Sequence, residues 1–513
     1  MLPRRPFVAV AMVLLVWFVP LPAGAASVED LEQKLKALQQ QMDELKQQIK
    51  QTQTPPPSPP SPPPSAATEP PTAPSRTLSI SDFKIGGYGS VRFEATDLRD
   101  LKSTFTFRRF VLSGDATIAN RLRGVVELEF ERLTELEVER ASPQEGGLRG
   151  FSQSIESSDK SEISLEQAWL QFALTDWAKF RAGMVLVPLG RFNINHDDNK
   201  WDLPRRSLVD RGVSVLPAQA AWSEVGMGFN GDIPIGRFGT LTYEAYVMNG
   251  VALDSSIETV ARGTGELEAE VEIRPRRGTA NIDVKNEKAG AFRLAWSPAI
   301  GHEIGASAYY GRYTPDFLPA ARVWAVSVDG KTTLGPFEIE GEYVFTRYDD
   351  ILRVARGFAR AVSERAFEAE VPPLTTAIEF DLAGLAATKH GYWLDLRYRF
   401  FPAVMRQSIL GRWFENPQFI VTARWEQVWL DGLVREVDFT GSQLTSITKE
   451  HRFVDRATLG FAYRPVPLVV FQAAYERTWT DHGKSLAGVT NFLPARAGED
   501  TANAFLFGVA FGF

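Results

Sequence analysis

Residues 337–345 have the sequence FEIEGEYVF, and residues 392–400 have the sequence YWLDLRYRF. In both stretches apolar residues occupy every second position, and most positions between them are charged. Residues 419–427, with the sequence FIVTARWEQ, alternate in the same way. Because successive side chains of a β-strand point to opposite faces, each stretch predicts a strand with one apolar and one polar face.

Outward from these stretches, the same pattern predicts sixteen strands in the second part of the chain. We place them near 83–95, 103–116, 120–132, 162–173, 178–187, 222–231, 238–249, 289–297, 302–313, 321–329, 333–346, 389–400, 417–429, 452–464, 467–479 and 502–513. The connections between them alternate between mostly tight turns and longer loops, such as 133–161, 188–221 and 250–288. A soluble β-sandwich shares the local alternation. The strand number, strand length and loop lengths favour a transmembrane antiparallel β-barrel of about sixteen strands.

Composition narrows the class of protein. The chain has 513 residues, a formal net charge of -7 and no cysteine. The charge argues against a nucleic-acid partner, and the lack of cysteine excludes disulfides and thiolate metal sites. Beyond the N-terminus no apolar stretch reaches the roughly 20 residues of a transmembrane helix. If the chain crosses a membrane, its lipid-facing residues must be every second residue of β-strands, and only a closed barrel satisfies the backbone groups of such strands in lipid.

The N-terminus predicts export. Two arginines precede an apolar run at 7–19, and prolines and a small-residue Ala-Gly-Ala site follow it. This order is typical of a secretory signal peptide over residues 1–25, and it fits an uncleaved anchor less well. The mature chain is therefore expected outside the cytoplasm.

Two further segments are expected before the barrel. Residues 26–53 carry a heptad seam that predicts an α-helical coiled-coil oligomerisation helix, with a single surface helix as the alternative. The seam residues are Val28, Leu31, Leu35, Leu38, Met42, Leu45 and Ile49. Residues 54–80 form a proline-rich linker that cannot pack a core. The barrel domain is expected at 81–513.

The last strand carries the most specific pattern. Phenylalanine or valine occupies every second position from Phe505 to Phe513. A strand of this form looks like the signal that barrel-assembly machinery recognises. We therefore expect that machinery to be a partner, through the strand that ends at Phe513.

The barrel portion resembles the phosphate-selective porin O/P family, an outer-membrane porin superfamily. The resemblance rests on residues 83–89 (FKIGGYG), 107–114 (FRRFVLSG), 165–172 (LEQAWLQF), 182–184 (AGM), 187–190 (VPLG), Arg206-Ser207 and 211–213 (RGV). It implies a sixteen-stranded homotrimeric channel in which the loop after residue 187 folds back into the barrel. The function implied is passive diffusion of small solutes or ions, with anions such as phosphate among the candidates.

Candidate site residues follow from the strand pattern and from this loop. The polar strand faces would line the lumen with Arg92, Arg181, Arg293, Arg397, Arg399, Arg424, Glu127, Glu129, Glu338, Glu340 and Glu342. We expect these charges to be solvated in a wet channel, either setting ion selectivity or forming an untuned wall. The loop at 188–221 would supply the pore constriction and selectivity through Arg191, Arg205, Arg206, Arg211, Asp197 and Asp198. An exposed loop kept soluble by the same charges is the alternative. Acidic residues are at least as numerous on the strands as basic ones, so phosphate does not follow from the resemblance.

Two other classes of function remain open at this point. The coiled coil could tether the outer membrane to the cell wall, with the barrel as an anchor and the helix in the periplasm. An enzyme on the same scaffold is the other, but the five histidines are scattered and none stands beside a nucleophile motif. We expect no catalytic activity, no metal and no cofactor, and outer-membrane lipid as the surroundings of the barrel.

Overall fold

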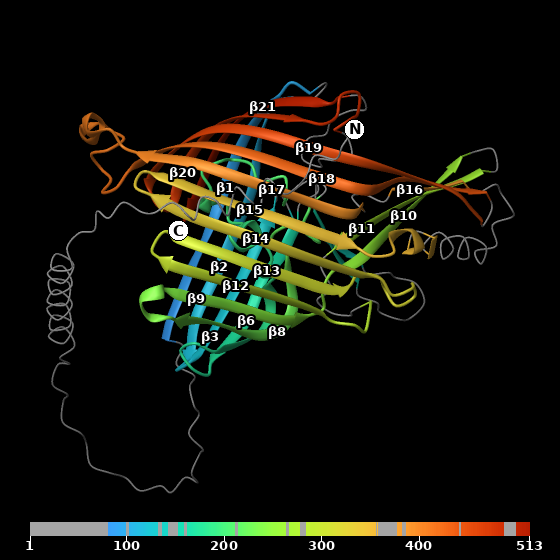
Figure 1. Cartoon of the computed structure of the whole chain (residues 1–513), viewed down its shortest axis with the longest axis horizontal. Helices are drawn as coiled ribbons and strands as arrows, with labels where there is room; N and C mark the ends of the chain where they lie inside the picture. The colour runs from blue at the N-terminus through green and yellow to red at the C-terminus, as the bar shows by residue number, and fades with distance from the viewer. Residues whose placement is uncertain are drawn as a thin grey trace, which may run out of the picture. The chain divides into compact units, whose positions relative to one another are not determined.

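Sixteen antiparallel strands form one closed barrel in the computed structural model (Figure 1). The structure describes residues 81–98, 102–131, 136–141, 152–157, 162–210, 214–262, 266–276, 284–354, 356–357, 377–381, 386–440, 443–486 and 499–513. The barrel and its strand number confirm the all-β barrel part of the expected fold class. The predicted signal peptide, coiled coil and linker all lie outside the described residues.

The barrel strands follow one another in sequence order around the wall. They are β1 (Ser81–Thr96), β2 (Thr104–Ala119), β3 (Leu122–Glu131), β6 (Glu162–Ala173), β7 (Lys179–Leu186), β8 (Ser223–Pro234), β9 (Thr240–Met248), β12 (Ala289–Ala299), β13 (His302–Arg312), β14 (Arg322–Leu334), β15 (Phe337–Tyr348), β17 (Ala386–Phe400), β18 (Gln418–Thr440), β19 (Gln443–Val466), β20 (Val469–Trp479) and β21 (Thr501–Gly512). Pairing of β21 with both β20 and β1 closes the barrel.

Some strands lie outside the barrel wall, within connections that the sequence pattern left as loops. β4 (Leu136–Ala141) pairs with β5 (Ser152–Ser157), and β10 (Ala252–Arg262), β11 (Glu266–Arg276) and β16 (Ala377–Asp381) form a second small sheet. β16 lies against β18, which with β19 runs beyond the length that a membrane strand needs (Figure 1). The expectation of plain loops at 133–161 and 250–288 was therefore wrong.

Short helices complete the described elements. They are α3 (Arg191–Ile194), η3 (Asp198–Lys200), η4 (Gly236–Phe238) and η5 (Ala403–Gln407). No helix in the described part of the chain is long and apolar enough to cross a membrane.

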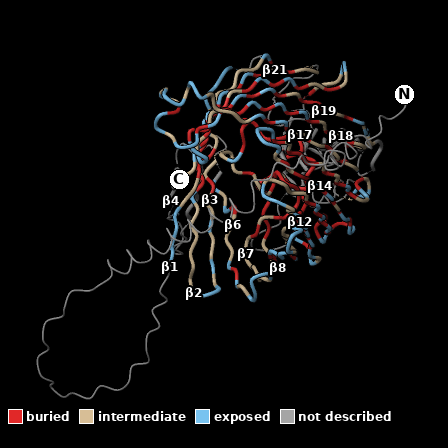
Figure 2. The backbone as a smooth tube through the Cα atoms, turned by 60° about the vertical axis from the view of Figure 1, so that its left-hand side comes forward, coloured by how far each residue is buried: buried red, intermediate tan, exposed pale blue. Residues whose placement is uncertain are grey.

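The outer face of the barrel is apolar, as β12 illustrates. Phe292, Leu294 and Trp296 are exposed on this strand, whereas Arg293 between them is buried on the inner face. The same alternation of exposed and buried residues runs along the neighbouring strands (Figure 2). An exposed apolar band around a closed barrel is the surface that lipid covers.

Two β-bulges interrupt the alternation and turn extra charged residues toward the interior. The register between β1 and β2 shifts between Ser90 and Val91, opposite Arg108. The register between β3 and β6 shifts beside Glu127, opposite Glu166. An extra residue at a bulge lets two consecutive side chains leave the strict alternation. Arg108 and its neighbour Arg109 therefore both reach the interior, which is the accommodation that two adjacent arginines in a lipid-facing strand require.

Candidate functional site: the segment inside the barrel

The connection between β7 and β8 folds into the barrel. We call residues 188–221 the inner segment; α3 and η3 belong to it. Most of its described residues are buried, among them Leu189 and Phe192, and Trp222 just after its end is buried as well. Its polar groups bond to residues on strands from both ends of the chain, as the following contacts show. The expected inward fold of this connection is therefore present.

Asn193 ties the two ends of the inner segment together. Its Nδ2 donates to the carbonyl oxygens of Val187, at 2.8 Å, and of Trp222, at 3.2 Å. Its Oδ1 accepts from the backbone N–H of Trp222 at 2.8 Å. Since buried backbone groups must find partners, one buried asparagine closes the neck of the segment by satisfying three of them.

Glu342 of β15 receives the first turn of α3. Its Oε2 accepts from the backbone N–H of Phe192 at 2.9 Å and from the indole N–H of Trp393 at 3.1 Å. A carboxylate at a helix N-terminus satisfies N–H groups that have no partner within the helix. Gly190 precedes the helix with φ of 76°, and an added Cβ would lie 2.1 Å from Oε1 of Glu342. Only glycine fits this turn.

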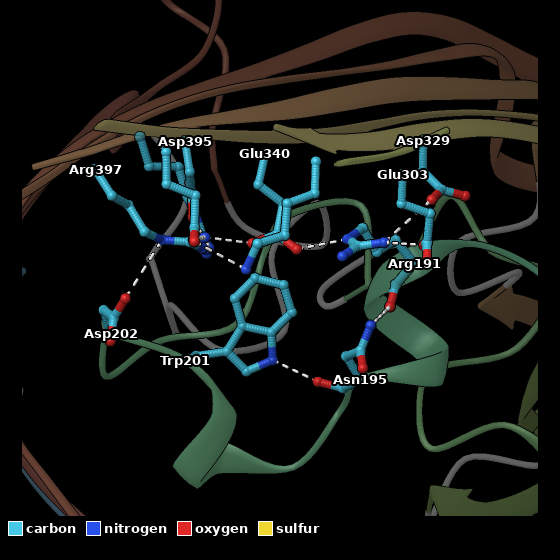
Figure 3. A network of polar contacts seen from close by, with 12 residues as sticks. Arg191, Asn195, Trp201, Asp202, Glu303, Asp329, Glu340, Asp395 and Arg397 are labelled. Atoms are coloured by element: carbon cyan, nitrogen blue, oxygen red, sulfur yellow. Dashed lines mark hydrogen bonds and ion pairs between the residues drawn. The ribbon is translucent and has the colours of Figure 1, made fainter. Parts of the chain in front are cut away.

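Arg191 anchors the inner segment to three strands (Figure 3). Its guanidinium lies 2.5 Å from Glu340 of β15 and 2.6 Å from Glu303 of β13, with Asp329 of β14 at 3.6 Å. Glu340 and Asp329 are buried, so these are ion pairs in a largely dry environment. Breaking one partner of such a pair leaves an uncompensated buried charge.

Arg397 of β17 is the centre of the neighbouring network (Figure 3). It pairs with Asp395 at 2.5 Å, with Glu338 at 2.7 Å and with Glu340. Its Nε lies 3.5 Å from Asp202 of the inner segment. Asp202 also pairs with Arg399 of β17 at 3.1 Å and with Arg464 of β19 at 2.7 Å, so two strands of the wall hold this carboxylate.

Arg205 and Arg206 lie in the middle of the inner segment. Arg205 pairs with Glu476 of β20 at 2.6 Å and with Glu94 of β1. Arg206 donates to the carbonyl oxygens of Ala220, at 2.9 Å, and His196, at 3.0 Å. Both arginines therefore hold the fold of the segment rather than project into open solvent.

Asp198 lies among arginines of the bulged strand β2. Its carboxylate is 3.5 Å from Arg108, 3.7 Å from Arg109 and 3.6 Å from Arg206, and it accepts from the Ser90 hydroxyl at 2.6 Å. Burial raises the pKa of Asp198, but the arginines outweigh it and hold the pKa well below its ordinary value. Asp198 is therefore ionised at any physiological pH.

His196 faces two carboxylates. Its Nδ1 lies 2.9 Å from the carbonyl oxygen of Asn193, and its Nε2 lies 3.5 Å from Glu166 and 3.4 Å from Asp197. A carbonyl oxygen can only accept, so Nδ1 carries a proton. Burial lowers the pKa of His196, but Glu166 and Asp197 outweigh it and leave the pKa above its ordinary value.

Aromatic rings pack the space between the segment and the wall. Phe192 stacks on Trp201 with ring centroids 4.4 Å apart, and Trp201 meets Trp393 of β17 edge-on at 5.4 Å. Arg397 and Arg424 lie over the Trp201 ring at 5.7 and 5.4 Å. Apolar rings inside a charged ion-pair network exclude water from it and strengthen each pair.

The wall formed by β3, β6, β7, β8 and β9 differs. Arg181 and Glu244 face the interior with side chains 19% and 23% exposed, 3.8 Å apart. Glu127 and Trp169 on this wall are half-buried, and Arg181 lies over the Trp169 ring at 4.2 Å. Arg181, Glu244 and Glu127 therefore keep contact with solvent, whereas Glu129 of β3, Glu166 of β6 and Glu224 of β8 on the same wall are buried.

The structure brings most of the expected site residues together, with one correction. Arg191, Arg205, Arg206, Asp197 and Asp198 lie inside the barrel, and Arg211 lies outside the described residues. The expectation that the strand charges are solvated was wrong for the buried residues, which are Arg293, Arg397, Arg424, Glu129, Glu338, Glu340 and Glu342. Arg92, Arg181, Arg399 and Glu127 keep partial exposure. The alternation within a strand gives no information about burial by a segment from another part of the chain.

Several partners of the inner segment were missed. They are Arg109, Glu166, Glu303, Asp329, Arg456 and Arg464. Glu303, Asp329 and Arg464 lie on predicted strands, and their polar strand faces were the available signal. Glu166 reaches the interior through a bulge, for which the sequence pattern gave no sign.

Among the described residues, no group of three or more histidine, aspartate or glutamate side chains has the arrangement of a metal site. The chemistry of the inner segment is that of ion pairs and hydrogen bonds. Such an arrangement can narrow a lumen, set its field and order water and ions.

Comparisons with known proteins give similarities at low identity. No protein-family model matches it. An uncharacterized protein of Aquifex aeolicus (strain VF5) is 24% identical over 225 residues, which are 44% of this chain and 43% of that protein, so the match spans less than half of this relative's length. The anion-selective porin from Comamonas acidovorans superposes with a TM-score of 0.43 and 9% identity, over 84% of this chain and 99% of that one. The outer-membrane channel DcaP of Acinetobacter baumannii superposes with a TM-score of 0.40 and 10% identity, over 84% of this chain and 97% of that one.

The barrel itself defines the class of protein. A closed antiparallel wall, an apolar outer face and a polar interior are the features of a transmembrane barrel in a bacterial outer membrane. Sixteen strands with an inner segment give it the general architecture of an outer-membrane porin. The comparisons and the structure do not extend this class to the phosphate-selective family.

Proposed function

We propose that the protein is a passive aqueous channel for small hydrophilic solutes or ions, with the inner segment as its constriction. The observation that supports this is the asymmetry of the interior. The inner segment is bound to the wall formed by β13 to β20 and also to β1, β2 and Glu166 of β6, while Arg181 of β7 and Glu244 of β9 on the opposite wall stay partly exposed. A route for solutes would run between the segment and this opposite wall.

A charged constriction suits such a channel. Within a narrow passage of low dielectric, fixed charges act on a permeating ion with little screening. Passive diffusion requires no nucleotide and no moving part. We therefore expect steady ohmic conductance from the purified protein in planar bilayers, without added ligand, and the reversal potential in a salt gradient reports its ion preference. A silent barrel would contradict the proposal.

The inner segment offers a direct test of its role. Single neutralisations of Arg191, Arg205, Arg206 and Arg211 should alter conductance or reversal potential for at least one of them. Arg347 is an exposed arginine of β15 that pairs with Asp349 at 3.3 Å, and Arg347→Gln is the matched control. If all four variants conduct like the control, the inner segment is not the constriction.

The assembly remains a proposal of its own. The heptad seam at 26–53 needs partner helices, and we propose a homotrimer in outer-membrane lipid, with the coiled coil in the periplasm. Cross-linking or native mass measurement in mild detergent should give trimers from the full chain. Deletion of residues 27–75 separates this from tethering to the cell wall: loss of envelope integrity with intact conductance would favour the tether.

A further inference from the structure

A small cavity lies between the inner segment and the strands β1, β2, β20 and β21. Its volume is about 10 Å³, and four arginines and one carboxylate are the charged residues that line it. These are Arg92, Arg108, Arg205, Arg206 and Asp198. The aromatic rings of Phe192 and Trp201 form part of its apolar wall.

Asp198 is the one carboxylate partner of these arginines that lines the cavity; Glu476, which pairs with Arg205 at 2.6 Å, and Asp210, 3.7 Å from Arg206, lie outside the lining. Glu94 is shared between Arg92, at 3.1 Å, and Arg205. Asp198 is shared among Arg108, Arg109 and Arg206, at 3.5 to 3.7 Å, while its close hydrogen bond of 2.6 Å comes from Ser90. At these distances the guanidinium groups attract Asp198 without a direct hydrogen bond to it. The lining of the cavity therefore presents four guanidinium groups and one carboxylate, while the other carboxylate partners of the arginines lie behind it.

Three of the arginines that line the cavity also have a buried N–H donor without an acceptor. The Nε–H groups of Arg92, Arg108 and Arg206 are buried and have no hydrogen-bond partner among the residues that the structure describes. A buried donor without an acceptor costs roughly 1–3 kcal/mol, and more when the donor is charged. An anion in the cavity would accept from these donors and would be attracted by the four guanidinium groups of the lining, whereas a neutral water molecule would do only the first.

We propose that this cavity binds one monoatomic anion of halide size, which chloride would supply. A cavity of about 10 Å³ admits a single water-sized particle. A tetrahedral oxyanion with four oxygen atoms needs more room and would have to displace the arginines. The site requires only the folded barrel, while any influence of the anion on permeation rests on the proposed channel function.

Bromide is the probe for this site because it replaces chloride and scatters anomalously. Crystals of the full chain soaked in sodium bromide should show an anomalous peak between Arg92 and Arg108. The peak should be lost in Arg108→Gln and retained in Arg347→Gln, and an excess of sulfate should not displace it. Absence of the peak in the unmodified protein overturns the proposal, and so does its displacement by sulfate.

Folding of the variants is checked independently. A folded barrel migrates faster than the heat-denatured chain in a detergent gel, so Arg108→Gln and Arg92→Gln are compared by this shift before crystallisation. If neither variant folds, the unmodified protein carries the test: its thermal unfolding midpoint should rise with chloride at constant ionic strength, against a large organic anion as the counter-salt. Equal midpoints in both salts would overturn the proposal.

The same preparation separates this proposal from the channel function. Conductance with no bromide peak would leave the channel and remove the site. A bromide peak in a barrel that carries no current would leave the site and remove the channel.

Discussion

The two walls of the barrel interior use charge in opposite ways. On the wall from β13 to β20, acidic and basic residues are buried and joined to the inner segment, as Arg191 with Glu340 and Arg464 with Asp202 show. On the wall from β3 to β9, Arg181 and Glu244 are 3.8 Å apart and partly exposed. A charge on the lumen side of a strand is therefore a candidate for selectivity only where no segment covers it.

The difference has a physical origin in desolvation. A buried ion pair loses its hydration, and only close contacts with well-aligned hydrogen bonds offset the free energy of that desolvation. Removing one partner leaves a buried charge without compensation, so it destabilises the protein far more than removing both. A partly hydrated ion pair contributes little to the free energy of unfolding, so removing one of its partners has a small effect on stability. The first wall should therefore respond to mutation through stability, and the second through permeation.

The largest expected effect follows from removing Arg397. Arg397→Met leaves Asp395, Glu338 and Glu340 buried without their shared cation. We expect a loss of about 3–5 kcal/mol in the free energy of unfolding, as for other broken buried pairs. Urea unfolding in detergent measures it.

The matched control for Arg397→Met is Arg181→Met on the other wall. Arg181 lies over Trp169 and beside Glu244, and its partial exposure limits the expected loss to about 1 kcal/mol or less. Equal losses in the two variants would remove the distinction between the walls.

A smaller effect is expected at the entry of the inner segment. Gly190→Ala places a Cβ 2.1 Å from the Glu342 carboxylate at a φ of 76°. Positive φ alone costs on the order of 1 kcal/mol, and the displaced Glu342 would also lose its bond to the Phe192 N–H. We expect destabilisation of more than 1 kcal/mol together with noisier single-channel current. Gly236→Ala is the control, because its φ is also positive and nothing lies within 4 Å of its added Cβ.

The barrel could be predicted from the sequence because lipid imposes a local rule. Each strand of a barrel meets lipid on one face, so period-two alternation recurs in every segment, as it does from Phe292 to Trp296. The closing strand from Phe505 to Phe511 follows the same rule and pairs with β1. Such a pattern requires no knowledge of tertiary contacts.

The inner site could be predicted only in part, because its contacts are distant in sequence. Arg191 and Glu340 are 149 residues apart, and Arg205 and Glu476 are 271 apart. Composition indicated a charged loop at 188–221, and the resemblance placed it inside the barrel, but neither gave its partners. The bulges at Arg108 and Glu166 also depend on register, which alternation alone does not fix.

The exposed wall should control ion preference with little cost in stability. Glu244→Gln removes one partly hydrated negative charge and should shift the reversal potential toward anions, while Arg181→Gln should shift it toward cations. Glu338→Gln on the wall from β13 to β20 is the comparison variant, because the Glu338 carboxylate is buried and paired with Arg397. If Glu338→Gln moves the reversal potential more than Glu244→Gln, solutes follow a route other than the proposed one.

The smallest expected effect is a pH dependence of stability that comes from the contact between His196 and Glu166 of β6. Glu166 and Asp197 favour the protonated imidazole, whereas Arg206 opposes its charge; Glu129 of β3 faces Glu166. Because the folded pKa is raised above the unfolded value of about 6.5, the stabilisation is complete below that pH and is lost as pH rises through the folded pKa. Above it, the Nε2 lone pair faces two carboxylates at 3.4 and 3.5 Å, which repel it. Unfolding midpoints of the unmodified protein should therefore fall more steeply with rising pH than those of His196→Gln, which keeps a donor but has no proton to lose. Parallel pH profiles for the two proteins would show that His196 does not hold the inner segment through its charge.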